Sequence, residues 1–355
     1  MQRFLKLSRF FLPATFLGYS LIANINFLQT GDLRVDLDQM AFLKGRVASE
    51  IDTAYVDSLP HRDISVGLIG AARYVLIGEG RSGVIAGDNG WLFTQEEAGP
   101  FGADLDTAAA EINTFGQRLR QHGTQLILVP VPGKLDVYSR FSGDQSPEIR
   151  GVYDGFLAAL DRQAIAHVDI RPTLLQGSAP KQTFLSTDTH WTPFGATAVA
   201  KAIANAGLIP LGDADYIGRA QDEKTLTGDL VSFVTSDVLA PIIGLRPEVI
   251  IPFDAVSKPD ANISIFGTDS IDTVLIGTSY SANTDWSFAE ALKLSLSRDV
   301  LNLATEGQGP VAPMRAYLNS PELAASAPRY VIWEFPVRYL SDPDLWQSHD
   351  AQGDV

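Results

Sequence analysis

Short apolar runs separated by helical segments constrain the fold of this chain most. Four such runs are QLILVPV (125–131), DTVLIGTS (272–279), VLNLA (300–304) and RYVIWEF (329–335). Runs of this length, without alternating polar residues, are typical of strands buried on both faces of a sheet. Because helical patterns lie between them, the sequence predicts an α/β fold with a mostly parallel sheet and helices on both faces.

The expected helices lie before Gly123, near 150–164, from Pro193 to about Asn205, near 285–297 and near 311–323. Residues 210–270 are rich in Gly, Pro, Asp and Thr, which predicts an irregular β-rich insertion. In open parallel sheets, reactive groups gather in the loops at the carboxyl ends of the strands. That rule selects the loops after Val131, Ile170, Ile276, Ala304 and Phe335.

The N-terminal segment has the pattern of a membrane insertion signal. Arg3, Lys6 and Arg9 precede Phe10–Thr30, a stretch without a charged residue. Basic residues before about 20 uncharged, mostly apolar ones predict a membrane anchor whose basic end stays in the cytoplasm. We therefore expect an anchor or uncleaved signal at residues 1–30, and a catalytic domain at 31–355 in the periplasm, held at the inner membrane.

Two alternatives for this segment stay open. Leu21-Ile22-Ala23 could serve as a signal-peptidase site, and the mature chain would then lack the segment. The segment could also be a helix buried in a core. Pro13 weakens it as a permanent membrane span.

Composition excludes several classes of function. The formal net charge of −15 disfavours nucleic acid as a partner. The absence of cysteine removes disulfides, thiolate metal sites and cysteine nucleophiles. The sequence predicts neither a metal site nor a cofactor.

A Gly-rich stretch, YVLIGEGRSGVIAGDNGWLF (74–93), contains the G-x-G-x-x-G spacing of dinucleotide-binding folds. That fingerprint requires a helix to begin at the last glycine. Here β-branched residues and an Asp-Asn-Gly turn follow instead. The pattern predicts a β-hairpin rather than a nucleotide site.

The segment STDTHWTP (186–193) combines a histidine with an aspartate two residues earlier. In an extended segment both side chains point to one side, so Asp188 could orient the ring of His190 and leave its other nitrogen free as a base. Thr192 is suited to cap a helix that Pro193 opens. A capping aspartate beside a solvated histidine is the alternative interpretation of this motif.

The segment GTSYSAN (277–283) follows an apolar strand. A serine directly after a Gly-marked turn at the carboxyl edge of a sheet is where a nucleophile is exposed, with its backbone N–H free to stabilise an oxyanion. Ser279 is thus the candidate nucleophile. The alternative is a plain loop serine or helix cap.

Taken together, GTSYSAN, STDTHWTP, GDNGWLF (87–93) and VIWEFPVRYL (331–340) resemble the alginate O-acetyltransferases, the AlgJ/AlgX-like branch of the SGNH hydrolases. The resemblance covers roughly residues 35–345. Ordinary SGNH enzymes place the serine first and the histidine motif last. This family is circularly permuted, and the present chain follows the permuted order.

The resemblance implies that Ser279 carries the acetyl group, that His190 is its base and that Asp188 is the orienting acid. Thr278 stands where most SGNH enzymes have aspartate. The AlgX type carries a carbohydrate-binding module beyond this region, and the chain stops at Val355, which favours the AlgJ type. Such an enzyme would take acetyl from a membrane-bound O-acyltransferase and, with other proteins of an export complex, place it on an exported polysaccharide such as alginate.

Four further residues are candidates for substrate or oxyanion contacts. Asn283 and Gly307, in a loop that also holds Gly309, are candidate oxyanion donors, with a capping asparagine and turn glycines as the alternatives. Lys134 and Arg338 follow the strands ending at Val131 and Phe335, and could bind an anionic glycan or be ordinary solvated charges or ion-pair partners.

Two other functions fit the same residues. An acetylesterase would use the same Ser-His-Asp triad with water as the acceptor. A non-catalytic polysaccharide-binding subunit would need no intact triad.

Overall fold

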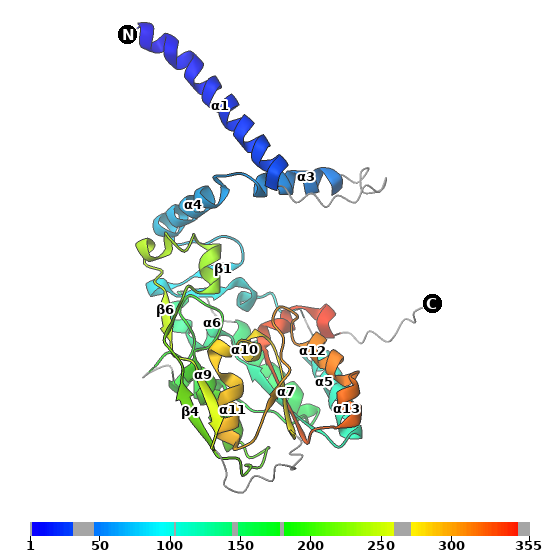
Figure 1. Cartoon of the computed structure of the whole chain (residues 1–355). Coiled ribbons are helices and arrows are strands. Elements are labelled where there is room, and N and C mark those ends of the chain that lie inside the picture. Colours follow the sequence, from blue (N-terminus) through cyan, green and yellow to red (C-terminus); the bar gives the residue numbers. More distant parts are fainter. Residues whose placement is uncertain are drawn as a thin grey trace. The chain divides into compact units, whose positions relative to one another are not determined.

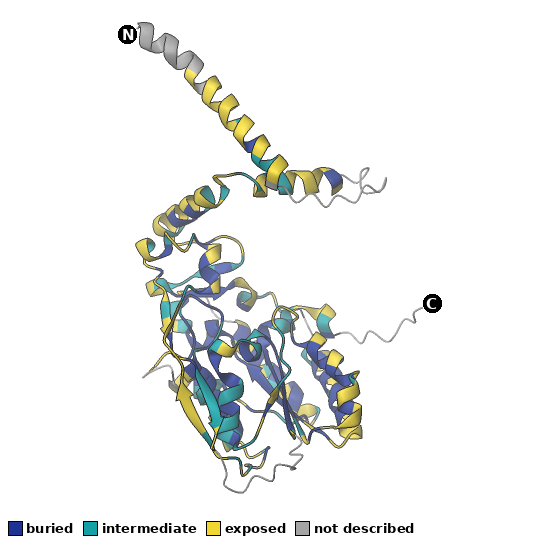
Figure 2. Cartoon of the chain, viewed as in Figure 1, coloured by how far each residue is buried: buried dark blue, intermediate teal, exposed yellow. Residues whose placement is uncertain are grey.

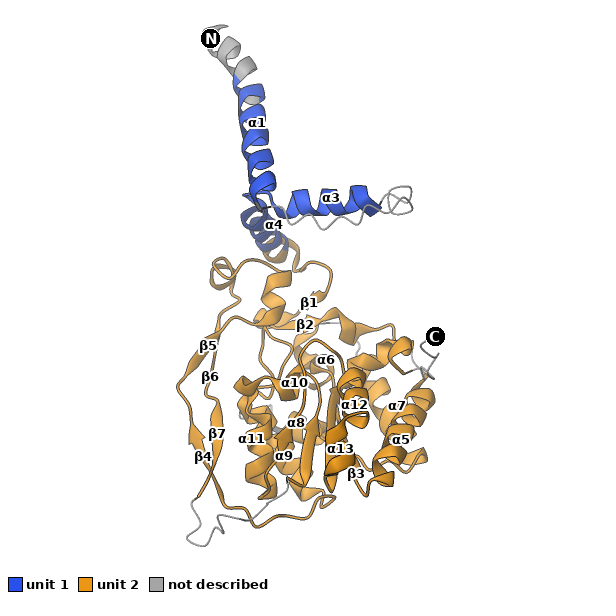
Figure 3. Cartoon of the chain, turned by 45° about the vertical axis from the view of Figure 1, so that its right-hand side comes forward, with its two compact units in different colours: residues 1–73 blue, residues 74–355 orange. Residues whose placement is uncertain are grey.

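The computed structural model describes residues 2–30, 46–102, 104–143, 148–177, 181–258 and 271–346. The chain divides into two compact units, residues 1–73 and 74–355. The boundary between these compact units lies within a helix, at residue 73. It does not test the predicted boundary between an anchor and a catalytic domain at residue 30, which stays a prediction. Figure 3 colours the two units separately.

The first unit is helical. It contains α1 (Gln2–Thr30), α3 (Arg46–Asp57) and most of α4 (Arg62–Ile77). The side chains described in α1 are mainly exposed and apolar (Figure 2). No described helix combines the length and the hydropathy needed to cross a membrane. Residues 31–45, at the start of the predicted catalytic domain, lie outside the described ranges.

The second unit is built on a four-stranded parallel sheet with the strand order β3-β10-β8-β9. These strands are β3 (Gln125–Val131), β10 (Tyr330–Pro336), β8 (Thr273–Ile276) and β9 (Leu301–Asn302). The four predicted runs therefore form the sheet. The segment that ends at Ile170, whose loop the sequence also selects, adds only an isolated bridge, in which His167 pairs with Leu128 of β3.

Helices cover both faces of the sheet, as predicted. The chain passes from β8 through α11 (Phe288–Leu296) outward to β9, and then through α12 (Val311–Leu318) back to β10. Because crossovers between parallel strands are right-handed, opposite directions of travel place α11 and α12 on opposite faces. Helix α9 (Pro193–Asn205) packs on α11, and α5 (Leu105–Gln121) packs on α12 (Figure 1).

The remaining elements enclose this core. The predicted hairpin in the Gly-rich stretch is present, with β1 (Val84–Ala86) antiparallel to β2 (Leu92–Thr94). The other helices used below are α6 (Lys134–Val137), α7 (Glu148–Arg162), α8 (Arg171–Gly177), α10 (Ser279–Ala282) and α13 (Pro321–Ala325). The sheet residues of β3, β8 and β10 are almost entirely buried (Figure 2).

The predicted β-rich insertion forms two small antiparallel ribbons. In one, β4 (Tyr216–Ala220) pairs with β7 (Phe253–Ser257); in the other, β5 (Lys224–Leu226) pairs with β6 (Glu248–Ile250). Two 3₁₀ turns, η4 (Asp229–Phe233) and η5 (Ala240–Ile243), lie between β5 and β6. Residues 259–270 of the predicted insertion lie outside the described ranges.

Candidate active site

The nucleophile turn connects β8 to α10. Thr278 is the N-cap of α10, and its hydroxyl accepts a hydrogen bond from the backbone N–H of Tyr280. Ser279 is the first helical residue, so its N–H has no acceptor within the helix. Gly277 is required here, because a Cβ at this position would stand 2.5 Å from a carboxylate oxygen of Glu334. The turn thus presents Ser279 at the carboxyl edge of the sheet.

The acid–base loop, residues 186–192, leads into α9. Pro193 is the first residue of that helix, and the Thr192 hydroxyl accepts a hydrogen bond from the backbone N–H of Gly195, as the sequence predicts. The backbone N–H of His190 donates to Asp188 Oδ1. This local hydrogen bond holds the aspartate and histidine side chains on one side of the loop.

Ser279, His190 and Asp188 form a continuous hydrogen-bond chain, although their positions in the sequence are far apart. Ser279 Oγ lies 2.7 Å from His190 Nε2, and His190 Nδ1 lies 2.6 Å from Asp188 Oδ1. Both distances are those of direct hydrogen bonds. Burial acts to raise the pKa of Asp188, but hydrogen bonds and charge from His190 outweigh it, so that this pKa is lowered. The chain is therefore arranged for proton transfer from serine to histidine.

Aromatic rings fix the histidine from two sides. The ring of Trp286 stacks on His190 at 5.2 Å between centroids and 20° between planes. The ring of Tyr280 lies 4.8 Å away on a tilt of 52°. With only 13% of its side chain exposed, His190 can approach Ser279 but has little freedom to rotate. No local sequence pattern marks these ring contacts.

A buried carboxylate supports the nucleophile turn from within the sheet. Glu334 of β10 is fully buried and accepts hydrogen bonds from the Thr278 N–H, the Thr278 hydroxyl and the Ser281 hydroxyl. Burial raises the pKa of Glu334, and these hydrogen bonds oppose that shift. Ser281 is 2% exposed and bonded to Glu334, so it is not presented as a second nucleophile.

Comparisons with known proteins show the family of this chain. Residues 84–337 match the family model described as SGNH hydrolase-like domain, acetyltransferase AlgX. The probable alginate O-acetylase AlgJ of Pseudomonas putida is 35% identical over 95% of this chain and 91% of its own length. The corresponding protein of Pseudomonas aeruginosa is 34% identical over 84% of this chain and 81% of its length. The chain belongs to the AlgJ/AlgX family of SGNH-like O-acetyltransferases.

Two solved structures have the same fold as this chain. The O-acetyltransferase domain of Pseudomonas putida AlgJ matches with a TM-score of 0.66 and 35% identity, covering 75% of this chain and 98% of that one. Pseudomonas aeruginosa AlgX, with a TM-score of 0.60 and 20% identity, covers 76% and 67% and shows the shared fold alone. The α/β SGNH-like fold, the family resemblance and the class of enzyme, an acyltransferase, are thus confirmed.

The structure contradicts the expectation that Lys134 lies on an open loop and could bind an anionic substrate. Lys134 is only 1% exposed. Its Nζ donates to the carbonyl oxygens of Leu92, Ser186 and Asp188 at 2.6, 2.9 and 2.8 Å. An ammonium group has three donors, so none remains for a substrate. Lys134 instead joins β2 to the acid–base loop through hydrogen bonds to both segments.

Arg338 is also enclosed rather than open. It is 7% exposed, its Nη1 donates to the Tyr280 hydroxyl, and its Nε lies 3.1 Å from Glu96 Oε2. Its guanidinium lies over the rings of Tyr280 and Tyr339. The expectation of a cation free to bind a glycan is therefore wrong here as well, and the ion-pair alternative describes this residue.

Asn283 and Gly307, the two candidate oxyanion donors, have the structural roles that were their alternatives, a capping asparagine and a turn glycine. The Asn283 side chain accepts a hydrogen bond from the backbone N–H of Asp285 and caps the 3₁₀ turn η6 (Thr284–Trp286). Gly307 is exposed, has a φ of +71° and has open space where a Cβ would stand, as turn glycines do. Its loop is tied to the nucleophile turn, because the Thr305 N–H donates to the Gly277 carbonyl. Their roles toward an oxyanion stay predictions.

Asp188, His190 and Asp229 have potential metal-ligand atoms within 4.8 Å of one another, so among the described residues they form a group that could hold a metal ion. Ligand atoms about 2.1 Å from a tetrahedral zinc ion lie about 3.4 Å from one another. His190 Nδ1 and Asp188 Oδ1 are closer than that, at 2.6 Å. The geometry favours a hydrogen bond over a shared metal ion. The expectation of no metal stays a prediction.

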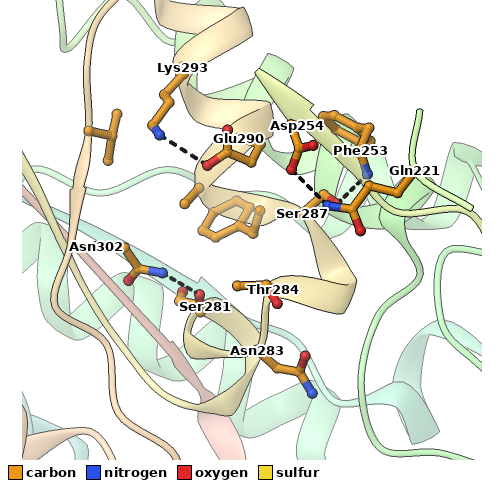
Figure 4. A pocket seen from close by; sticks show the side chains of 13 residues that line it. Gln221, Phe253, Asp254, Ser281, Asn283, Thr284, Ser287, Glu290, Lys293 and Asn302 are labelled. Atoms are coloured by element: carbon orange, nitrogen blue, oxygen red, sulfur yellow. Dashed lines mark hydrogen bonds and ion pairs between the residues drawn. The ribbon is translucent and has the colours of Figure 1, made fainter. Parts of the chain in front are cut away.

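A pocket of about 230 Å³, lined by both polar and apolar side chains, lies beside α10. Figure 4 shows Ser281 and Asn283 on one side, Asn302 of β9 nearby, and Gln221 and Asp254 of the insertion opposite. The amide of Asn302 donates to the Ser281 carbonyl, and Lys293 pairs with Glu290 of α11. Hydroxyl, amide and charged groups of both signs thus line a cavity against the helix that carries Ser279.

Proposed function

We propose that this protein transfers an acetyl group, through an acetyl-serine intermediate, to hydroxyl groups of alginate or a similar exported polysaccharide. The hydrogen-bond chain Ser279–His190–Asp188 carries the chemical part of the proposal. The names of the relatives, probable alginate O-acetylases, support the choice of polymer.

In the first half-reaction, Ser279 Oγ attacks the carbonyl carbon of the donor's acetyl group while His190 Nε2 takes the hydroxyl proton. Asp188 stabilises the imidazolium that forms. We expect the Ser279 N–H, which has no acceptor within α10, to donate to the carbonyl oxygen on which negative charge develops. Collapse of the tetrahedral intermediate breaks the bond to the donor, and the leaving group takes the proton from His190.

In the second half-reaction, an acceptor hydroxyl loses its proton to His190 Nε2 and attacks the acetyl-serine carbonyl. The ester bond to Ser279 breaks, and the serine oxygen regains the proton from His190. Water in place of the sugar hydroxyl would give an acetylesterase with the same groups. Only the identity of the acceptor, a sugar hydroxyl or water, distinguishes the transferase from the esterase.

The test of this function uses p-nitrophenyl acetate as the acetyl donor, with and without alginate oligosaccharides. Mass spectrometry of the sugars is expected to show acetylated products, and the rate of acetate release is expected to fall as acceptor is added. Equal acetate release in both conditions, with unmodified sugars, would favour the esterase. No turnover of donor would favour the non-catalytic subunit.

We further propose that an N-terminal anchor places the catalytic unit in the periplasm, where a membrane-bound O-acyltransferase supplies acetyl. The support is the order of Arg3, Lys6 and Arg9 before the uncharged segment Phe10–Thr30, together with the exposed apolar side chains of α1.

Reporter fusions test this topology. Alkaline phosphatase, which is active only in the periplasm, is expected to be active when fused after Val355. A cytoplasm-only reporter at the same site is expected to be inactive. Replacing Arg3, Lys6 and Arg9 with glutamate should weaken the bias, since basic residues hold their end in the cytoplasm. Activity of the cytoplasmic reporter in the unmodified chain would contradict the proposed location.

A further inference from the structure

The β-rich insertion lies directly against the acid–base loop. The backbone N–H of Asp229, in η4, donates to Asp188 Oδ2 at 3.0 Å. The next N–H, of Leu230, donates to the Thr187 carbonyl at 3.2 Å. A Cβ on Gly228 would stand 2.2 Å from the backbone of Thr187, so only glycine allows this approach. The insertion thus occupies the oxygen of Asp188 that His190 does not use.

The side chain of Asp229 also faces the histidine. Its Oδ1 accepts the Thr189 N–H at 2.8 Å, and its Oδ2 accepts the Thr189 hydroxyl at 2.6 Å. The same Oδ2 lies 3.8 Å from His190 Nδ1. Both oxygens act as acceptors, which is the pattern of an ionised carboxylate.

Resting on the proposed function, we propose that Asp229 is a second carboxylate of the acid–base machinery: a positioning residue that fixes Asp188 and adds negative charge beside the His190 imidazolium. Its backbone orients Asp188, and its side chain stabilises the charged ring formed during each acetyl transfer. The insertion is therefore part of the active site.

Several other charged groups lie near His190 and contribute, with Asp229, to the electrostatic field at its ring. Asp188 carries the nearest negative charge, and the ammonium of Lys134 lies on the Asp188 carbonyl. Glu248 of β6 accepts hydrogen bonds from the N–H groups of Ser186 and Thr187. The packed rings of Tyr280 and Trp286 are uncharged. Burial, and then the charge of Asp188, raise the pKa of Asp229, as two neighbouring carboxylates require.

The test compares Asp229→Asn with the wild-type protein. The amide can accept the Thr189 N–H and donate to the Thr189 hydroxyl, so the shape is kept and the charge is removed. The ring signals of His190, followed by NMR against pH and assigned with His190→Gln, are expected to titrate at lower pH than in the wild-type protein, because a lost negative charge disfavours the imidazolium. Asp237→Asn, an exposed aspartate of the same insertion, should leave them unchanged.

Kinetics give the matching readout. The rate of acetyl-serine formation from p-nitrophenyl acetate should fall about five- to tenfold in Asp229→Asn, and the acid limb of its pH profile should move to lower pH by the same amount as the NMR titration. A lower rate with an unmoved titration would mean a structural role and overturn the proposal, as would no change in either. The NMR titration does not depend on turnover, so failure of the proposed function would show separately, as a wild-type protein that forms no acetyl-serine.

Discussion

Replacing Ser279 with alanine is expected to abolish the acetyl adduct and to lower turnover of p-nitrophenyl acetate by about ten-thousand-fold or more. Residues of a triad act as a unit, so removing the nucleophile removes the whole catalytic contribution of His190 and Asp188 as well. Ser279 lies at the edge of the sheet and fills little of the core, so the free energy of unfolding should hardly change.

Two variants serve as comparisons for this substitution. Ser326→Ala, at an exposed position after α13, should keep wild-type turnover. Ser281→Ala should keep the adduct on Ser279, although loss of a hydrogen bond to buried Glu334 should slow its formation. If Ser279→Ala kept most of the activity while Ser281→Ala lost it, the assignment of the nucleophile would be wrong.

Replacing Lys134 with methionine is expected to lower the free energy of unfolding by about 3 kcal/mol or more, because the carbonyl oxygens of Leu92, Ser186 and Asp188 each lose the hydrogen bond that the buried ammonium donates. Activity should fall too, since one of these carbonyls belongs to Asp188. Denaturant unfolding measures the change. Lys201→Met, on the exposed side of α9, is the control and should change stability by less than about 0.5 kcal/mol.

The pH dependence of this stability difference can be predicted as well. Burial, opposed by the charges of Glu248 and Glu97, lowers the pKa of Lys134 to about 8 in the folded protein. Between about pH 8 and the ordinary lysine value of 10.5, the unfolded chain holds a proton that the folded one lacks, so wild-type stability gains with rising pH. The gap between wild type and Lys134→Met should therefore widen over this range. A constant gap would contradict the buried position of the ammonium.

The strands, the helix opened by Pro193 and the order of the motifs could be predicted because each has a local signal. QLILVPV, for example, is apolar at every position that the sheet buries. Strand β9 is shorter than the predicted run 300–304, since it stands at the edge of the sheet and pairs with β8 alone. Asp188, His190 and Ser279 could be selected because each follows a strand or precedes a helix start.

The role of Lys134 could not be predicted, because its partners are backbone carbonyls, which leave no mark in the amino-acid sequence. Asp229 was missed for a related reason: it meets the acid–base loop only through the folding of the insertion. Glu334 did leave a signal. It is a lone acid within the apolar run RYVIWEF, and a buried carboxylate in a central strand needs nearby donors.

In the proposed reaction, one acetyl group passes from Ser279 to a polysaccharide hydroxyl. A single-turnover chase follows this transfer from the protein to the sugar. The protein is acetylated with isotopically labelled p-nitrophenyl acetate, freed of donor and mixed with alginate oligosaccharides. We expect peptide mass spectrometry to locate the label first on Ser279, and we expect the label then to appear in the sugar faster than it appears as acetate in buffer. Label on another residue, or label recovered only as free acetate at the same rate with and without the oligosaccharide, would contradict it.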